Sequence, residues 1–260
     1  MSTPPNDSIP LNPVRARLKE HQPCIGILVT MPSVPLTQTL AAAGFDWLFI
    51  DMEHGPLDIA SVHAMIAATG GTRAAPFVRV PWNLPWLCKP VLDAGAMGVV
   101  FPMIRTAEEA RRAVSAVRYP PAGERGYGPF YAPPRWGLST AEYVAAADDE
   151  IVAMVLIEHR EAIENVESIL AVPGVDVAFI APFDLALSYG KREGPDEEVR
   201  EAIAVAERAI LASDAHLGGL ALDADQANGM IERGYRMIAM GYDALLIERA
   251  SADLLGGINR

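Results

Sequence analysis

The sequence predicts a single (β/α)8 barrel of the α/β class, and three observations support this prediction. Short apolar or β-branched runs alternate with helical segments eight times along the chain. The length of 260 residues is that of one large barrel domain. The glycine-rich phosphate turn that typically opens a doubly wound sheet is missing from the sequence. Together these features favour a closed barrel over an open sheet.

The elements follow one another regularly along the chain. Residues 1–12 are polar and proline-rich, which predicts a loose tail before a barrel domain of residues 13–260, and residues 13–20 predict a short helix covering one end of the barrel. Strands are predicted where β-branched and aromatic residues cluster, at residues 24–29, 46–50, 76–80, 98–101, 151–157, 175–180, 217–222 and 237–240. Helices are predicted after them, at residues 35–43, 58–69, 84–94, 107–117, 160–170, 197–212, 224–233 and 244–255.

One long insertion interrupts this alternation. Residues 118–139 are rich in proline, glycine and aromatic residues, and an extra helix is predicted at residues 141–147. A loop of about 20 residues is uncommon in a compact domain and is usually functional or an interface. The insertion is therefore either a lid or subunit contact, or a surface excursion with packed aromatic side chains.

Charge and cysteine content narrow the class of protein. The net charge of −12 argues against nucleic acid and against an anionic membrane surface as partners, although a local arginine or metal can still receive an anionic small molecule. Cys24 and Cys88 lack CxxC spacing and are expected to be reduced, packed thiols. No apolar run reaches the ~18 residues of a membrane span, and no basic segment with an apolar run behind it opens the chain. We expect a cytoplasmic protein.

Ionisable side chains follow four of the predicted strands. In a barrel the carboxyl ends of the strands meet at one rim, where reactive groups gather. The side chains expected there are Asp51, Glu53, His54, Arg79, Glu158 and Asp184. The alternative for the first three is structural, with Asp51 and Glu53 capping the helix at residue 58 and His54 solvated.

The two later carboxylates, Glu158 and Asp184, suit a divalent cation. Hard oxygen ligands with open positions fit Mg²⁺ or Mn²⁺, whereas an acid and base pair would leave Arg79 and His54 without a task. A structural ion pair with Arg79 is the remaining alternative. A Schiff-base mechanism is disfavoured, because none of the lysines lies on a predicted strand, and these are Lys19, Lys89 and Lys191.

Several segments together resemble the HpcH/HpaI aldolase family, in order from about residue 24 to the end. They are residues 44–47 through 53–55, 78–81, 92–96, 119–126 and 182–185. The family consists of metal-dependent class II pyruvate aldolases, including the 4-hydroxy-2-oxoheptanedioate and 2-keto-3-deoxy sugar acid aldolases. The resemblance implies the same class of enzyme here.

The resemblance also implies roles for three residues that would carry out the chemistry. His54 matches the catalytic base, and Arg79 matches the arginine that stabilises oxyanion charge and binds substrate. Asp93, in the helix after the third strand, matches an aspartate that raises the basicity of the histidine. On the residues alone, the preferred interpretation of Asp93 is a helix-terminal charge beside Gly95.

The binding residues follow in the same way. Glu158 and Asp184 match the ligands of a divalent metal ion, Mg²⁺ or Mn²⁺ with Co²⁺ as a further candidate, and no organic cofactor is implied. The backbone amides of Phe183 and Asp184 match those that hold the substrate carboxylate. Leu156 stands at the substrate where relatives usually carry glutamine, and this loss of a hydrogen bond predicts weakened or redirected recognition. Ala181 replaces a common glycine, and Leu28 a tryptophan of some relatives.

The expected reaction is the reversible cleavage of a 4-hydroxy-2-oxo acid into pyruvate, or a close 2-oxo acid, and an aldehyde. The metal ion and Arg79 would stabilise the enolate formed when the C3–C4 bond breaks. Two alternatives stay open. One is a related metal–enolate lyase or decarboxylase acting on a 2-oxo acid or an acyl-CoA, and the other is a catalytically silent metabolite-binding barrel.

The last helix predicts an assembly. Its apolar side chains form a face wider than one barrel side can bury, made by Leu245, Leu246, Ala250, Leu254 and Leu255. The resemblance implies that this helix is exchanged between barrels in dimers that assemble into hexamers. A homo-oligomer, most simply a hexamer, is therefore expected.

Overall fold

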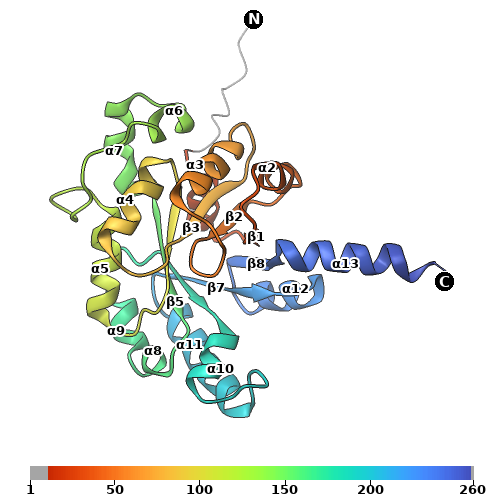
Figure 1. Ribbon diagram of the computed structural model, residues 1–260. Helices are drawn as coiled ribbons and strands as arrows, with labels where there is room; N and C mark the ends of the chain where they lie inside the picture. The colour runs from red at the N-terminus through yellow and green to blue at the C-terminus, as the bar shows by residue number, and fades with distance from the viewer. Residues whose placement is uncertain (1–10, 259–260) are drawn as a thin grey trace, which may run out of the picture.

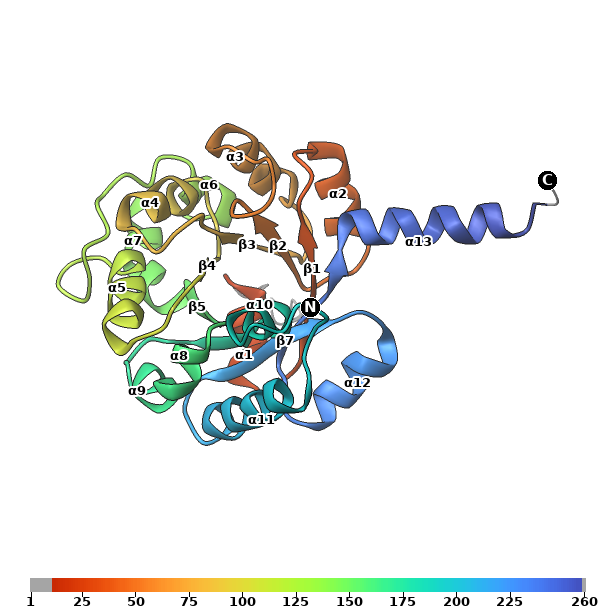
Figure 2. The same ribbon diagram turned by 60° about the horizontal axis from the view of Figure 1, so that its bottom comes forward.

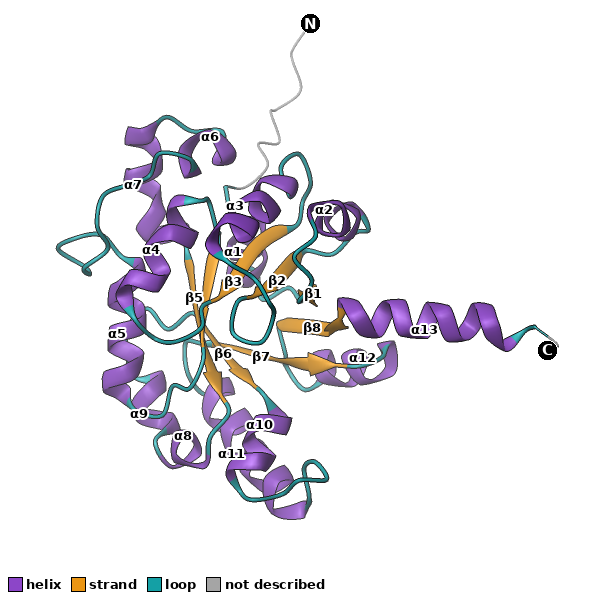
Figure 3. Cartoon of the chain, viewed as in Figure 1, coloured by secondary structure: helices purple, strands orange, loops and turns teal. Residues whose placement is uncertain are grey.

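The computed structural model describes residues 11–258 and contains a closed barrel of eight parallel strands, as predicted. Each strand pairs with its neighbours in sequence order, and β8 closes the barrel against β1. Figures 1 and 3 show the strands at the centre and the helices around them. The strands are β1 Cys24–Val29, β2 Trp47–Asp51, β3 Ala75–Arg79, β4 Gly98–Phe101, β5 Val152–Ile157, β6 Val177–Ile180, β7 His216–Ala221 and β8 Met237–Tyr242.

Most of the helices form the outer ring and run back from the carboxyl end of one strand to the amino end of the next; α1 precedes the first strand, and α13 follows the last. They are α1 Pro13–Lys19, α2 Val34–Ala42, α3 Ile59–Ala68, α4 Pro85–Asp93, α5 Ala107–Val117, α6 Ala132–Trp136, α7 Thr140–Glu150, α8 Arg160–Glu164, α9 Val166–Leu170, α10 Pro182–Ser188, α11 Glu197–Leu211, α12 Ala224–Glu232 and α13 Asp243–Gly256.

Three elements differ from the prediction. The helix expected over residues 160–170 is divided into α8 and α9 at Asn165, whose side-chain amide donates to the carbonyl of Arg105 at 3.0 Å. The short helices α6 and α10 were not predicted. Both begin at or next to proline, which is favourable in a first turn, but both are too short to show a hydrophobic period.

The interior of the barrel is filled by large side chains that pack against glycine residues on neighbouring strands. Trp47 and Phe77 are fully buried, with their rings 5.5 Å apart in an edge contact. A side chain on Gly26 would approach the Trp47 ring to 2.5 Å, and one on Gly98 would approach the Phe77 ring to 2.2 Å. The two glycines therefore make the room that the aromatic layer needs, and the layer supports the site above it.

The predicted tail ends earlier than expected. Residues 1–10 lie outside the described residues, but Asn12 is fully buried, so the prediction of a loose chain up to residue 12 is wrong at its end. The Asn12 side chain accepts from the N–H groups of Val14 and Arg15 and donates to the carbonyl of Glu150 at 2.8 Å. It is the N-cap of α1, and its capping bonds fix that helix under the amino end of the barrel.

Asp176 joins three elements at this amino end. Its carboxylate is paired with Arg15 of α1 and with Arg118, the C-cap of α5, and it accepts the N–H of Ala153 on β5 at 2.8 Å. Asp176→Ala should lower the free energy of unfolding by about 3 kcal/mol or more, because two guanidinium groups would lose their partner in a largely buried place. Urea unfolding checks this, with Asp214→Asn as an exposed control at the same end. Equal stabilities would contradict it.

The insertion lies at the amino end of the barrel, between α5 and β5. The Trp136 indole N–H donates to the carbonyl of Gly95 at 3.0 Å, so its aromatic side chain is packed, but Tyr127 and Phe130 are 70% and 76% exposed. Within one chain the insertion therefore cannot be a lid over the carboxyl-end rim. A subunit contact and a surface excursion remain as interpretations.

The final helix leaves the barrel. Figures 1 and 2 show α13 extending away from the other elements, and Asp243, at its first position, is the residue of this helix that is buried. The Asp243 carboxylate accepts the N–H groups of Thr30 and Met31, each at 2.9 Å, and thereby anchors the helix to the end of β1. Leu254 is 79% exposed. None of the helices in the described part of the chain is long and apolar enough to span a membrane.

Candidate active site

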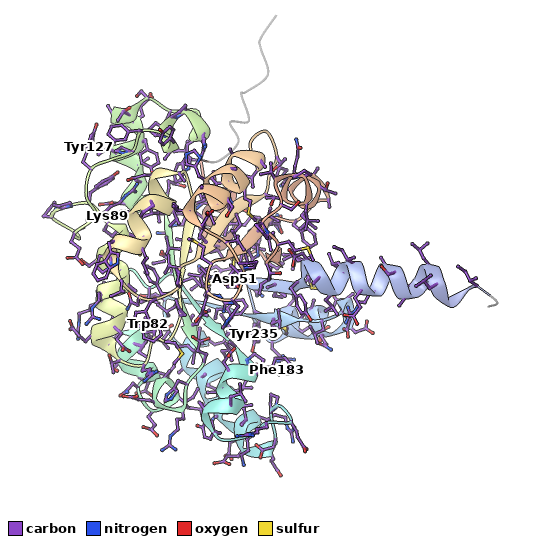
Figure 4. The ribbon with its side chains drawn as sticks, in the orientation of Figure 1. Asp51, Trp82, Lys89, Tyr127, Phe183 and Tyr235 are labelled. Atoms are coloured by element: carbon purple, nitrogen blue, oxygen red, sulfur yellow. The ribbon has the colours of Figure 1, made fainter. Side chains whose placement is uncertain are left out.

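Asp51 organises the turn that follows β2. Its side chain is 1% exposed, and its Oδ1 accepts the N–H groups of Glu53 at 3.0 Å and His54 at 3.4 Å. Figure 4 shows Asp51 at the centre of the barrel. The helix α3 is capped by Asp58, not by Asp51 or Glu53. The structural alternative for these two acids is thus not what the structure shows, and Asp51 instead holds the turn in place.

Arg79 lies beside Asp51 because the two residues are register partners on neighbouring strands. The Arg79 Nε–H donates to Asp51 Oδ1 at 2.7 Å, Nη2–H donates to Asp51 Oδ2 at 2.6 Å, and Nη1 lies 3.1 Å from Glu53 Oε2. The guanidinium also lies 5.3 Å from the centre of the Phe49 ring. Two carboxylates and an aromatic face thus fix its orientation.

His54 is the most solvent-accessible of these groups. Its side chain is 64% exposed, and its Nε2 lies 3.8 Å from Glu53 Oε2. Burial raises the pKa of Glu53, while Arg79 and His54 oppose that rise and Asp51 and Asp184 add to it. The imidazole is therefore free to meet a substrate at the rim, with a carboxylate near enough to stabilise its protonated form.

Glu158 follows β5 and is 4% exposed. Its Oε1 accepts the N–H of Met103 at 2.6 Å, and Met103 has a φ of 56°, a left-handed conformation that is unusual for a residue other than glycine. The pKa of Glu158 is raised to about 7, mainly by burial; the Met103 N–H and Arg79 oppose this rise, and the carboxylates of Glu53 and Asp184 add to it. Three acids therefore share one region, and Arg79 forms its ion pairs with Asp51 and Glu53 and not with Glu158 within residues 11–258.

This raised pKa predicts a pH effect on the protein freed of divalent ions. The folded state binds the Glu158 proton more tightly than the unfolded state, so its contribution to stability is complete below the unfolded pKa near 4.5 and is lost as the pH rises through about 7. The loss amounts to about 3 kcal/mol. Glu158→Gln cannot ionise and should lack it. The difference in free energy of unfolding between the variant and the parent should therefore grow from pH 5 to pH 8, and a constant difference would contradict the assignment.

Asp184 and Phe183 lie in the first turn of α10, directly after β6. The first hydrogen bond of this turn is donated by Leu185 to Ala181, and the N–H groups of Phe183 and Asp184 have no protein acceptor in the described part of the chain. Figure 4 shows Phe183 on α10, beside the barrel axis. Phe183 and Asp184 line the same cavity, of about 130 Å³, as His54 and Arg79.

Leu156 forms part of the floor of this cavity. It is 1% exposed and lies on β5, in register with Phe179 of β6. The Phe179 ring in turn makes an edge contact with Phe49, with ring centres 6.0 Å apart. The floor is therefore apolar, while the wall above it carries the ionisable groups.

Asp93 is not brought to this site within one chain. It ends α4, which leads back to the amino end of β4, whereas His54 follows the carboxyl end of β2. The Asp93 carboxylate accepts from the Arg125 Nη2–H at 3.1 Å, and burial raises its pKa while Arg125 opposes that rise. The structure thus favours the helix-terminal interpretation, in which Asp93 holds the insertion through Arg125.

Three contacts within the site were not predicted from the sequence. Asp51 and Glu53 were expected at the rim, but their contacts with Arg79 were not predicted, because the first depends on strand register and the second on the conformation of the turn after β2. Met103, in the loop after β4, orients Glu158. A methionine does not predict a left-handed backbone conformation, so this contact was not expected.

Comparisons with known proteins agree with this geometry. A family model described as HpcH/HpaI aldolase/citrate lyase matches residues 26–250. A hydroxypyruvate/pyruvate aldolase from Roseovarius nubinhibens is 37% identical over 247 residues, covering 95% of this chain and 96% of the relative. A 4-hydroxy-2-oxo-heptane-1,7-dioate aldolase from Escherichia coli is 39% identical over 245 residues, covering 94% and 93% of the two chains.

A solved structure shows the same arrangement of the chain. The HpcH/HpaI aldolase/citrate lyase family protein from Burkholderia cenocepacia J2315 superposes with a TM-score of 0.87 at 34% identity, covering 94% of this chain and 98% of that one. A match over most of the chain in family, sequence and structure leads to one conclusion. The chain is a carbon–carbon lyase that belongs to the HpcH/HpaI aldolase/citrate lyase family.

Proposed function

We propose that the chain reversibly cleaves a 4-hydroxy-2-oxo acid into pyruvate, or a close 2-oxo acid, and an aldehyde, and that it needs a divalent metal ion. The observation that carries the proposal is the cavity bordered by a clamped arginine, an exposed histidine and the carboxylate of Asp184, with Glu158 close by. The names of the relatives support the same reaction type, since both are aldolases acting on 2-oxo acids.

The residues present fit a divalent ion. The Asp184 carboxylate adds to the rise in the pKa of Glu158, and neither acid forms a salt bridge within residues 11–258. Both offer hard oxygen donors. Within residues 11–258 no group of three or more His, Cys, Asp and Glu side chains is arranged to bind a metal. Two carboxylates with water and substrate in the remaining positions match the usual coordination of Mg²⁺ or Mn²⁺. A bound ion would act as a Lewis acid on the 2-oxo group.

The backbone and side-chain groups of the protein have separate roles in the reaction. The N–H groups of Phe183 and Asp184 bind the substrate carboxylate at the start of α10. The His54 imidazole accepts the proton of the substrate's 4-hydroxyl group. The C3–C4 bond breaks, and the electrons of that bond pass into the enolate of pyruvate. Arg79, already oriented by Asp51, stabilises the oxygen on which that charge develops. Glu53, 3.8 Å from His54, stabilises the imidazolium.

An imine mechanism is disfavoured by the placement of the lysines. In the described chain no lysine lines the cavity. Lys191 is paired with Asp196 and Glu198, each at 2.8 Å, and Lys89 lies on the outer helix α4.

We propose that the reaction takes place in the cytoplasm, because Cys24 and Cys88 are free, buried thiols.

Metal-dependent pyruvate release tests the proposal directly. Chelator-treated protein is mixed with a 4-hydroxy-2-oxo acid, and pyruvate is measured by reduction to lactate, with and without added Mg²⁺, Mn²⁺ or Co²⁺. Cleavage that requires the ion supports the proposal. Cleavage that persists after complete removal of metal would overturn the metal dependence, and release of carbon dioxide instead of an aldehyde would assign a decarboxylase. Tight binding without turnover would assign a metabolite-binding barrel.

We further propose a homo-oligomer, most simply a hexamer, in which α13 packs on a second copy. Leu246, Ile247 and Leu254 are exposed on a helix that stands away from its own barrel. Truncation before Ala244 should yield insoluble protein, since the surface that receives the helix would lose its cover. Light scattering of the full chain at micromolar concentration should show the assembly, and a monodisperse, active monomer would contradict it. Leu211→Gln, on an exposed leucine of α11, serves as a control that leaves the assembly intact.

A further inference from the structure

The cavity has a charged side and an apolar side. The ionisable groups come from β2, β3, β5 and β6 and the turns that follow them. The remaining sector, formed by β7, β8 and β1, contributes Leu220 and Leu28 to the lining. Between them β8 contributes Ala239, which is the register partner of both Leu220 and Gly26 and is fully buried. Ala239 does not itself border the cavity, and Leu28 is the register partner of Tyr242, so the apolar recess is formed by Leu28 and Leu220 themselves.

The recess adjoins the base. His54 follows β2, which pairs with β1, and His54 and Leu28 line the same cavity. If His54 takes the proton of the 4-hydroxyl group, the carbon that bears this group lies beside it, and that carbon comes from the aldehyde. The 2-oxo acid half is held on the opposite side, at the start of α10. The chain attached to the aldehyde carbon then lies beside His54 against Leu28 of β1, and Leu220, on the strand next to β6, completes the apolar side of the same cavity.

Around Leu28 and Leu220, the described lining residues place no unpaired arginine or lysine to receive a charge on that chain. Among the described residues that border the cavity, Arg79 is the one permanent cation, and its guanidinium is bound by Asp51 and Glu53. The side chain of the floor residue Leu156 is apolar and provides no hydrogen bond. A carboxylate placed in this recess would lose water without gaining a partner, whereas an apolar group would gain from burial.

We propose that the aldehyde half of the substrate carries an apolar chain or ring seated between Leu28 and Leu220, and not a distal carboxylate. This inference rests on the proposed aldolase function and adds the class of its aldehyde. It makes Leu28 and Leu220 specificity-determining residues. The E. coli relative, by contrast, is named for a substrate with a second carboxylate.

A pair of aldehydes of equal shape tests the proposal. Succinic semialdehyde and 4-methylpentanal differ in that a carboxylate replaces an isopropyl group of similar volume. With pyruvate and saturating Mn²⁺, kcat/KM for aldol addition should favour 4-methylpentanal by about tenfold or more. Leu28→Gln and Leu220→Gln should each reduce this ratio several-fold, because both place an amide in the recess. Leu211→Gln makes the same change on α11, at the amino end of the barrel, and should leave the ratio unchanged.

A binding measurement gives a readout that does not require turnover. The adducts that lack the 4-hydroxyl group, 7-methyl-2-oxooctanoate and 2-oxoheptanedioate, cannot be cleaved, and calorimetry should show the former binding about tenfold more tightly. Deuterium exchange into the methyl group of pyruvate reports enolate formation separately. If exchange occurs but the carboxylate compounds are preferred or equal, the inference is overturned and the proposed function stands. If exchange is absent, both are overturned. Ratios unchanged in both cavity variants would also overturn the inference, provided that thermal unfolding shows them folded.

Discussion

Replacing Glu158 or Asp184 with Ala is expected to abolish aldol cleavage and metal retention while the barrel stays folded. The rate should fall by about a thousand-fold or more, because the loss of a ligand removes a Lewis acid that supplies several kcal/mol at the transition state. The fold should survive because Glu158 and Asp184 follow the ends of β5 and β6, outside the packed layers of the barrel. Removing Glu158 also removes a buried acid whose ionisation is costly, as its raised pKa indicates.

The measurement combines kinetics with metal analysis of the dialysed protein. Glu164→Ala, an exposed acid on the neighbouring helix α8, is the matched control and should retain both activity and metal. Thermal unfolding confirms that each variant is folded. If metal still binds stoichiometrically to both Glu158→Ala and Asp184→Ala, the ligand assignment is wrong.

Replacing Arg79 with Ala should lower kcat by about 10²- to 10³-fold at saturating metal, with a much smaller change in substrate binding. The reason is that the guanidinium acts on charge that develops only as the enolate forms. Arg79→Lys should restore little of the rate, because an ammonium group cannot donate two parallel hydrogen bonds to Asp51 and also reach Glu53. Equal effects on binding and turnover would instead make Arg79 a binding residue.

Arg79 is buried and ion-paired, so its loss also affects stability, and a second variant separates the two effects. Arg118 is equally buried and is paired with Asp176 at the amino end of the barrel. Arg118→Ala should destabilise the fold to a similar extent and leave kcat nearly unchanged. A comparable fall in kcat for both variants would show that the effect of Arg79→Ala is structural.

The names of the relatives indicate that the reaction type and the aldehyde have to be tested separately. The relatives with similar sequences are named for more than one 2-oxo acid reaction, so the reaction type and the aldehyde are separate questions. The charged side of the cavity concerns the reaction type, and the apolar side formed by Leu28 and Leu220 concerns the aldehyde. Variants on the charged side should change turnover with every aldehyde, whereas variants on the apolar side should change the ratio between aldehydes.

Much of the fold was predictable because its signals are local. The β-branched and aromatic runs placed all eight strands to within about two residues, and their alternation with helices gave the barrel. The rim residues Arg79, Glu158 and Asp184 could be predicted in turn, since the carboxyl ends of parallel strands in a barrel must share one end. Short elements such as α10 were not predicted, because seven residues contain too few turns to show a helical period.

Contacts between distant segments could not be predicted, because they depend on which surfaces the closed barrel brings together. The sequence by itself determined the barrel, its rim of ionisable side chains and the family. The tertiary structure alone decided that Asp51 clamps Arg79, that Met103 orients Glu158, and that Asp93 lies at the opposite end from His54. The physical reason is that strand register, helix direction and a left-handed backbone are set by packing across the whole barrel, and no local run of residues encodes them.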